Sequence, residues 1–258
     1  MLIDTHVHLS DDCYKDSLEG IIAGLEANKV EKVINIGYDF NSSKIGYEMS
    51  QKYASVYAAV GVHPSNASEY NAQTEAFIRS VANNKKIVAI GEIGLDYYRG
   101  TEQKELQKSV FISQLKLANE FNLPVVIHIR DAYGDALTIL KEHKHLLNNS
   151  GVLHCYGGSL EYAEEVLKLG LYFGFDGPIT FKNSNTAEKV LKHLPIDRVL
   201  IETDSPYLTP HPYRGKINEP KYVGLVAQKM AETFNISEQE LIEQTNKNAK
   251  NLFKKLSD

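Results

Sequence analysis

The sequence predicts an α/β fold, a (β/α)8 TIM barrel that spans residues 1–258 as a single domain. Two observations carry this prediction. Short apolar runs rich in β-branched residues recur along the chain, and amphipathic stretches separate them. Strand and helix alternate in this way when helices connect parallel strands. An open doubly wound sheet shares the alternation, but the polar residues that follow the runs favour the barrel.

The predicted strands are short and almost continuously apolar, as expected for parallel strands that are covered on both faces. In chain order they are residues 2–5, 32–37, 56–62, 87–91, 124–128, 152–154, 171–175 and 199–202. Eight such runs match the number of strands in a TIM barrel.

Helices are expected between these runs and after the last of them. The helical stretches are residues 18–28, 42–52, 75–83, 105–122, 133–144, 160–169, 186–193, 223–234 and 237–252. In the fourth stretch, apolar residues recur near a 3.6-residue period. Asn41 or Ser42 is the expected N-cap of the second helix. Ser237, with Glu240 three residues later, forms a capping box at the start of the last helix.

Composition limits the possible functions. Hydrophobic residues make up 43% and charged residues 24% of the chain, which is ordinary for a globular protein. The net charge is −5, whereas proteins that coat nucleic acid are usually basic, so any contact with nucleic acid must be local. Cys13 and Cys155 are too few for a disulfide framework. With no visible signal peptide or membrane segment, the sequence predicts a cytoplasmic protein without membrane contact.

Potential metal ligands follow five of the predicted strands, where TIM barrels place their active sites. These residues are His6, His8, Glu92, His128, His154 and Asp204. Because side chains alternate along a strand, His6 and His8 are expected on the same face, pointing into the barrel mouth. Of the nine histidines, about one would fall at a strand end by chance, and five do, counting His63.

Imidazole and carboxylate groups are ligands for zinc, manganese and similar divalent ions. Taken singly, each residue also has a structural interpretation. Glu92 could be a loop residue or an ion-pair partner, and His128 or His154 a hydrogen-bonded polar residue. The combination predicts a metal centre. Six donors exceed the need of one tetrahedral ion, so we expect two divalent ions per chain that share a bridging carboxylate.

Six segments together resemble the TatD family of metal-dependent deoxyribonucleases. They are residues 4–8 (DTHVH), 61–64 (GVHP), 91–97 (GEIGLDY), 128–130 (HIR), 154–156 (HCY) and 202–206 (ETDSP). The resemblance runs from the first predicted strand to the last. It implies the metal-dependent hydrolase type of TIM barrel, as in the amidohydrolase superfamily.

The resemblance also implies a distribution of ligands. One ion would be held by His6, His8, Glu92 and Asp204, and the other by Glu92, His128 and His154. Many proteins of the wider superfamily bridge their metals with a carboxylated lysine. This sequence has Glu92 at the corresponding strand end and therefore needs no modified lysine.

The predicted catalytic residues are Asp204, Glu92 and His63, which would support in-line hydrolysis by a metal-activated water. Asp204 is expected to orient that water or take its proton, with a pure ligand role as the alternative. His63 would contact a substrate phosphate or make a structural hydrogen bond. Glu202 could orient a ligand histidine or form an ion pair inside the barrel. Cys155 is expected to pack away from the mouth.

Cations and aromatic residues on the loops after the strands are candidates for substrate binding. The predicted set is His63, Arg130, Arg214 and Tyr97, because arginine binds phosphate with two hydrogen bonds and aromatic rings stack on bases. Each could instead be a solvated charge or a packing residue. Further candidates are Arg99, Lys182, Lys216, Tyr98, Tyr156 and Tyr207.

Three functions remain open from the sequence. The first is a deoxyribonuclease that acts exonucleolytically on single-stranded DNA or DNA ends, without an obligate protein partner. The second is an ester or amide hydrolase such as a D-aminoacyl-tRNA deacylase, since the same metals can activate water against carbon or phosphorus. The third is a non-catalytic binding protein, which would not require all six ligands. The loop cations favour phosphate, and the acidic net charge favours a small or end-only substrate.

Overall fold

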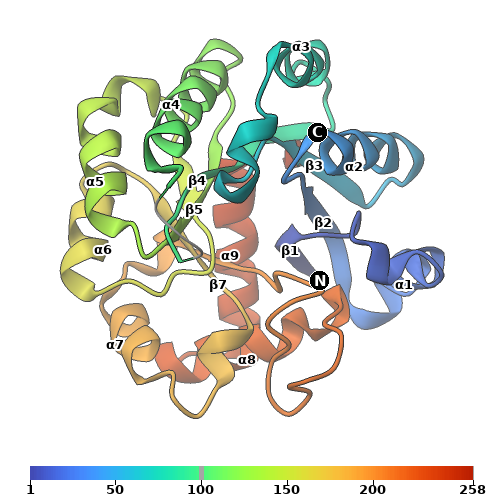
Figure 1. Ribbon diagram of the computed structural model, residues 1–258. Coiled ribbons are helices and arrows are strands. Elements are labelled where there is room, and N and C mark those ends of the chain that lie inside the picture. Colours follow the sequence, from blue (N-terminus) through green and yellow to red (C-terminus); the bar gives the residue numbers. More distant parts are fainter. Residues whose placement is uncertain (99–101, 258) are drawn as a thin grey trace.

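The computed structural model describes residues 1–98 and 102–257, and these residues contain one sheet of eight parallel strands in sequential order. The strands are β1 (Leu2–Val7), β2 (Val30–Ile36), β3 (Val56–Val60), β4 (Ile87–Asp96), β5 (Val125–Arg130), β6 (Gly151–Leu153), β7 (Tyr172–Phe175) and β8 (Val199–Ile201). Helices surround the strands (Figure 1). The predicted (β/α)8 barrel is confirmed.

The barrel closes between its first and last strands. Val7 and Ser205 form a parallel bridge. The N–H of Asp204 donates to the carbonyl of His6 at 2.9 Å, and the N–H of His8 donates to the carbonyl of Ser205 at 2.7 Å. An open doubly wound sheet would leave these edges unpaired, so that alternative is wrong.

The helices that connect the strands are α1 (Leu18–Ala23), α2 (Phe40–Lys52), α3 (Ala72–Val81), α4 (Lys104–Glu120), α5 (Tyr133–Glu142), α6 (Leu160–Leu167) and α7 (Asn185–His193). Two more, α8 (Val223–Phe234) and α9 (Glu238–Leu252), follow β8. Ser237 caps α9 by accepting a hydrogen bond from the N–H of Glu240. The predicted capping box is only half formed, because the described contacts include no return bond from the Glu240 side chain to the N–H of Ser237. None of the described helices is both long and apolar enough to cross a membrane.

The predicted start of the second helix is wrong because the N-cap is Asp39, which lies before both expected residues. Its carboxylate accepts the N–H of Ser42 at 2.7 Å, and the Ser42 hydroxyl accepts the N–H of Asp39 at 2.9 Å. This reciprocal pair satisfies amide groups that the first turn leaves free. The first helix is also shorter than predicted, since it ends at Ala23 and a separate 3₁₀ turn, Glu26–Asn28, follows.

The C-terminal segment fills the bottom of the barrel. Apolar side chains of the strands pack there against Ala249, Leu252, Phe253 and Leu256. The Lys255 ammonium donates to three main-chain carbonyls just before or at the start of β4, those of Ala82, Asn84 and Ile87. In Figure 1, α9 lies behind the barrel mouth. The open end of the barrel is therefore the one at which the strands finish.

Candidate metal centre

The six predicted ligands come together at the C-terminal end of the barrel. His6 lies in β1, Glu92 in β4 and His128 in β5. His8 and His154 directly follow β1 and β6, and Asp204 lies three residues after the end of β8. The prediction that β4 ends at Gly91 is wrong, because the strand continues to Asp96 and Glu92 lies within it. Above the ligands is a cleft of about 750 Å³, lined in part by His8, Glu92 and Asp204.

Four donor atoms, one of them Glu92 Oε2, form a first group. His6 Nε2 lies 3.2 Å from His8 Nε2 and 3.6 Å from Glu92 Oε2. Asp204 Oδ1 lies 3.2 Å from His8 Nε2 and 3.6 Å from His6 Nε2. Tetrahedral ligands at zinc-like bond lengths stand roughly 3.3–3.6 Å apart. The spacing of this first group therefore fits one divalent ion.

A second group of donors surrounds the other oxygen of the same carboxylate. Glu92 Oε1 lies 3.0 Å from His128 Nδ1 and 2.8 Å from His154 Nε2. The two ring nitrogens are 3.1 Å apart. His63 Nε2 stands at the edge of this group, 3.7 Å from Glu92 Oε1. Glu92 thus presents one oxygen to each group, which is the arrangement of a bridging carboxylate.

The charges in the centre suit cation binding. Burial would raise the pKa of the Glu92 carboxyl, but the surrounding histidines, His154 first, hold that pKa well below its usual range. Burial opposes ionisation of Asp204 as well, and the hydrogen bond from His8 leads the effects that lower its pKa. Both carboxylates are therefore ionised at neutral pH, as metal ligands must be.

The histidines divide into two kinds, and the pKa of His6 is lowered by burial like that of His63. Burial would lower the pKa of His8, His128 and His154, but the carboxylates that they face raise it above its usual value. His63 lacks such a close partner, and burial lowers its pKa to about 3. The N–H of Ser65 donates to His63 Nδ1 at 3.1 Å. Since Nδ1 accepts, the proton of neutral His63 sits on Nε2, which faces Glu92.

Asp96 is a carboxylate neighbour of the predicted ligand His128 that the sequence prediction missed. Its Oδ2 lies 3.2 Å from His128 Nε2, on the side of the ring away from Glu92. The pairing of β4 with β5 sets this contact, because Gly94 pairs with His128 and Asp96 pairs with Arg130. A predicted strand that continued to residue 96 would have placed Asp96 beside His128. Such outer carboxylates orient metal-binding histidines.

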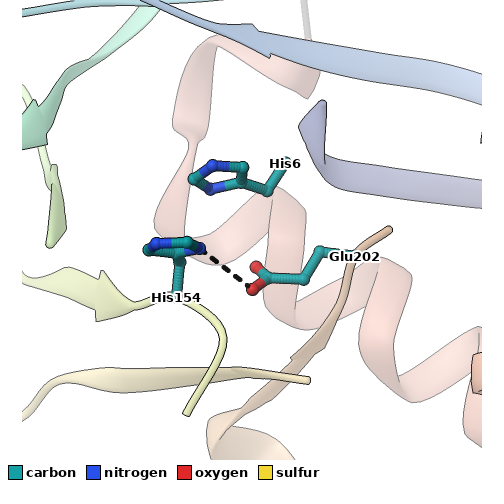
Figure 2. Close-up of side chains that lie close together, drawn as sticks. All are labelled: His6, His154 and Glu202. Carbon is teal, nitrogen blue, oxygen red and sulfur yellow. Dashed lines mark ion pairs between the residues drawn. The ribbon is translucent and has the colours of Figure 1, made fainter. Parts of the chain in front are cut away.

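Glu202 occupies a comparable position under the second group. Its Oε1 lies 3.6 Å from His154 Nδ1 (Figure 2) and accepts the N–H of Cys155 at 2.5 Å. Cys155 itself lies partly exposed in the cleft wall, so the expectation that it packs away from the mouth is wrong. The reason is that β6 ends at Leu153, and Cys155 has a positive φ of 44°, so strand alternation does not extend to it.

Arg130 lies in the cleft wall among the predicted substrate-binding residues, whereas Tyr97 is directed elsewhere. The Arg130 guanidinium lies over the ring of Tyr98, 3.6 Å from its centroid. Tyr98 is 60% exposed. The hydroxyl of Tyr97 donates to Asp135 at 2.9 Å, and the described cleft lining does not include Tyr97. The tyrosine in contact with Arg130 is therefore Tyr98, although Tyr98 too is not part of the described cleft lining.

The remaining candidates are spread around the mouth. Tyr207 lines the cleft and donates to Asp11. The Arg214 guanidinium covers the ring of Phe181 at 4.1 Å, and Tyr156 is buried and donates to the carbonyl of Ser159. Arg214, Tyr156, Lys182 and Lys216 are not part of the described cleft lining. Arg99 lies outside the described residues.

A (β/α)8 barrel with histidine and carboxylate clusters at its C-terminal mouth defines the class of metal-dependent hydrolases. Comparison with known proteins agrees. Residues 3–254 match the family model described as TatD related DNase. The chain therefore belongs to the TatD family.

Two relatives and one solved structure illustrate this membership. The chain is 45% identical to the uncharacterized metal-dependent hydrolase YabD of Bacillus subtilis, covering 98% of this chain and 99% of the relative. It is 32% identical to the 3'-5' ssDNA/RNA exonuclease TatD of Citrobacter rodentium, covering 98% and 97%. The crystal structure of the TatD homolog YjjV from Escherichia coli superposes with a TM-score of 0.91 at 28% identity, covering 98% of each chain.

Proposed function

We propose that the protein is a deoxyribonuclease that uses two divalent ions to hydrolyse phosphodiester bonds at the ends of single-stranded DNA. The observation that carries the proposal is the Glu92 carboxylate, which gives one oxygen to each donor group. A relative named as a single-strand exonuclease supports the choice of substrate. Bound ions would supply an activated water and neutralise charge on the phosphoryl oxygens.

The chain's own residues have distinct tasks in this proposal. Asp204, ionised and at the cleft wall, orients the attacking water and receives its proton. His63 donates its Nε2–H to a non-bridging phosphate oxygen, because its Nδ1 is already occupied by Ser65. Arg130, held flat against Tyr98, binds a phosphate with two parallel N–H groups.

The charge of the cleft supports action at an end. Its described lining includes the carboxylates of Glu92, Asp96, Asp131 and Asp204, and Arg130 is the one lysine or arginine among those residues. A protein that follows a long nucleic acid needs a row of cations to hold the backbone. This cleft instead suits one scissile phosphodiester next to the metal ions, with exposed aromatic surface for a terminal base.

The same observation favours one alternative substrate class. A cleft with a single described cation also accommodates an uncharged carboxylic ester or amide, such as the linkage in a D-aminoacyl-tRNA. The donor groups activate water equally well against a carbonyl carbon. We place this second because Arg130 and His63 offer three N–H groups to anionic oxygen.

A side-by-side assay tests the proposal. The purified protein, reconstituted with zinc, manganese, magnesium or nickel, is incubated with linear and circular single-stranded DNA, RNA, D-aminoacyl-tRNA and a simple ester. Chelator-treated protein and His128→Ala are the controls. We expect metal-dependent release of nucleotides from linear DNA and none from the circle. Turnover restricted to the ester or aminoacyl substrate would refute the nuclease.

Two further features remain predictions. We propose a cytoplasmic location, supported by two cysteines that are free thiols. We also propose that residues 1–258 act as a single domain, supported by the strands joining one sheet within the described residues. Fractionation of cells and limited proteolysis would test these points.

A further inference from the structure

We propose that Glu202 is a positioning residue that orients one ligand imidazole of each donor group, so that the affinities of both ions depend on it. The inference rests on the proposed two-ion centre and deepens it. The two imidazoles are those of His6, from the first group, and His154, from the second. Their common neighbour is a carboxylate on the chain just after β8.

The three side chains form one buried cluster below the metal centre. The rings of His6 and His154 stack with centroids 4.0 Å apart and planes 16° apart. One ring nitrogen of each and one carboxylate oxygen of Glu202 lie within 4.8 Å of one another. Figure 2 shows the two rings one above the other, with the carboxylate beside them. All three residues are buried.

Hydrogen-bonding needs indicate what the cluster does. The Nε2 atoms of His6 and His154 face Glu92 in the donor groups, so the Nδ1 atoms are left for other partners. Both Nδ1 atoms are buried and lack a hydrogen bond to any described residue, and Glu202 Oε2 is in the same situation. Buried polar atoms left unpaired are costly. Two N–H donors and one carboxylate acceptor would satisfy each other if these side chains came within hydrogen-bond distance.

This pairing would fix the tautomer of each ligand. A histidine that binds metal through Nε2 must carry its proton on Nδ1, and an outer carboxylate holds it there. Glu202 Oε1 lies 3.6 Å from His154 Nδ1 and is anchored by the N–H of Cys155 at 2.5 Å. With Oε1 anchored, Oε2 is available to the stacked His6 ring.

The stacking argues against a third ion in the same place. Nearly parallel rings direct their Nδ1 lone pairs side by side, so the lone pairs do not converge on one point. A carboxylate, in contrast, has two separate oxygens that can each accept one N–H. The geometry therefore fits Glu202 as an acceptor for both rings.

Gly174 in β7 provides the space for this carboxylate. A Cβ atom at position 174 would lie 2.2 Å from Glu202 Oε2 and 2.5 Å from its Cδ. Any other residue would push the Glu202 side chain out of its position. Gly174 therefore allows a test of the position of the carboxylate without altering its charge.

Asp96 provides the matched comparison. It contacts the ring of His128 and therefore serves the second donor group alone. If Glu202 serves both groups, removing the Glu202 carboxylate and removing the Asp96 carboxylate should affect metal binding differently. Asp96→Asn should lower the affinity for one ion, and Glu202→Gln should lower the affinity for both. In Glu202→Gln, the new amide can donate to a ring nitrogen and so favours the tautomer that cannot bind metal.

The experiment titrates metal-free protein with zinc by calorimetry and counts ions by elemental analysis. The wild-type protein should bind two ions. Glu202→Gln and Gly174→Ala should lower the affinity for both ions by about 10- to 100-fold, and Asp96→Asn should lower the affinity for only one. Gly20→Ala, where an added Cβ meets nothing within 4 Å, is the control and should bind as wild type. Imidazole ¹⁵N spectra of metal-free protein should show Nδ1 protonation of His6 in wild type, lost in Glu202→Gln.

The possible results separate this inference from the proposal beneath it. A wild-type protein that binds fewer than two ions refutes the two-ion centre itself. A wild type with two ions and a Glu202→Gln variant that retains either affinity overturns the role of Glu202. If circular dichroism shows that Glu202→Gln does not fold, Gly174→Ala decides by the same criterion.

Discussion

Asp204 donates its main-chain N–H to the carbonyl of His6 at 2.9 Å, so a hydrogen bond that closes the barrel joins two residues of the first donor group. Their side chains, Asp204 Oδ1 and His6 Nε2, stand 3.6 Å apart above this bond. Because the residues come from the first and last strands, the first donor group can assemble only when the barrel has closed.

Substitution of single ligands should remove the ions one at a time. His128 belongs to the second group alone and Asp204 to the first, so His128→Ala and Asp204→Ala should each leave one ion per chain. We expect hydrolysis to fall at least about 100-fold in both, with unchanged circular dichroism. Elemental analysis and the nuclease assay check this. An active His128→Ala enzyme would contradict its role as a ligand.

Metal binding should release protons and weaken as the pH falls. The pKa values of His8, His128 and His154 lie above the usual value in the metal-free protein, because these histidines face carboxylates. Protons therefore compete for the ligand nitrogens at a higher pH than for ordinary histidine. Calorimetry at pH 8 and pH 6, in buffers of different ionisation enthalpy, counts the protons.

The control for proton release is His63. With a pKa of about 3, it carries no extra proton in this range, so His63→Gln should release the same number as wild type. An unchanged metal affinity between pH 8 and pH 6 would contradict the raised pKa values.

His63 should act through its N–H group. His63→Ala should lower kcat by about 100-fold, the usual loss when one donor to a developing negative charge is removed. His63→Gln retains an N–H at a similar reach and should recover part of the activity. Ion content should stay at the wild-type value in both. Loss of one ion in His63→Ala would show instead that His63 is a ligand, as its place beside Glu92 and His128 allows.

Arg130 should affect substrate binding more than chemistry. Removing its charge-assisted hydrogen bonds in Arg130→Ala costs about 1.5–3 kcal/mol, which raises KM by roughly 10- to 100-fold. Arg130→Lys should restore little, because a lysine lacks the planar pair of N–H groups. Tyr98→Ala removes only the stacking support and should raise KM about 2- to 5-fold. Steady-state kinetics on short single strands decide, and an unchanged KM in Arg130→Ala would exclude the phosphate contact.

Lys255 should stabilise the fold without influence on the site. Its ammonium donates to three carbonyls at 2.9–3.0 Å at the bottom of the barrel. Lys255→Met retains most of the aliphatic length and removes the donors, so the free energy of unfolding should fall by about 2 kcal/mol. Urea denaturation of metal-free protein measures this, and kcat should match wild type. A loss of activity at equal stability would mean that the two ends of the barrel are linked.

The fold was predictable because the strands and their end residues obey simple rules. Parallel strands are continuously apolar, and TIM barrels gather polar residues at one end, so His6, His128 and Asp204 were singled out from positions far apart in the chain. Those rules predict that the ligands gather at one end, whereas their division into two groups was implied by the resemblance to the TatD family. Whether these residues bind metal in solution stays a prediction.

What the sequence could not provide was set by register and by tertiary contacts. Asp96 contacts His128 only because β4 continues beyond Gly91 and pairs with β5. Tyr98 faces Arg130 for the same reason, whereas the adjacent Tyr97 is drawn to Asp135. Periodicity assigns residues to faces of an element, but it does not say how far a strand extends or which of two neighbours lies toward a cleft.

Because α9 and Phe253 fill the bottom of the barrel, the protein could be attached to a surface by that end in one defined orientation. This packing holds the C-terminal segment at the end of the barrel opposite the cleft. A linker joined to that segment would anchor the protein with its cleft facing the solution. Strands of nucleic acid could then reach every anchored molecule, which would suit a single-molecule test of the proposed exonuclease activity.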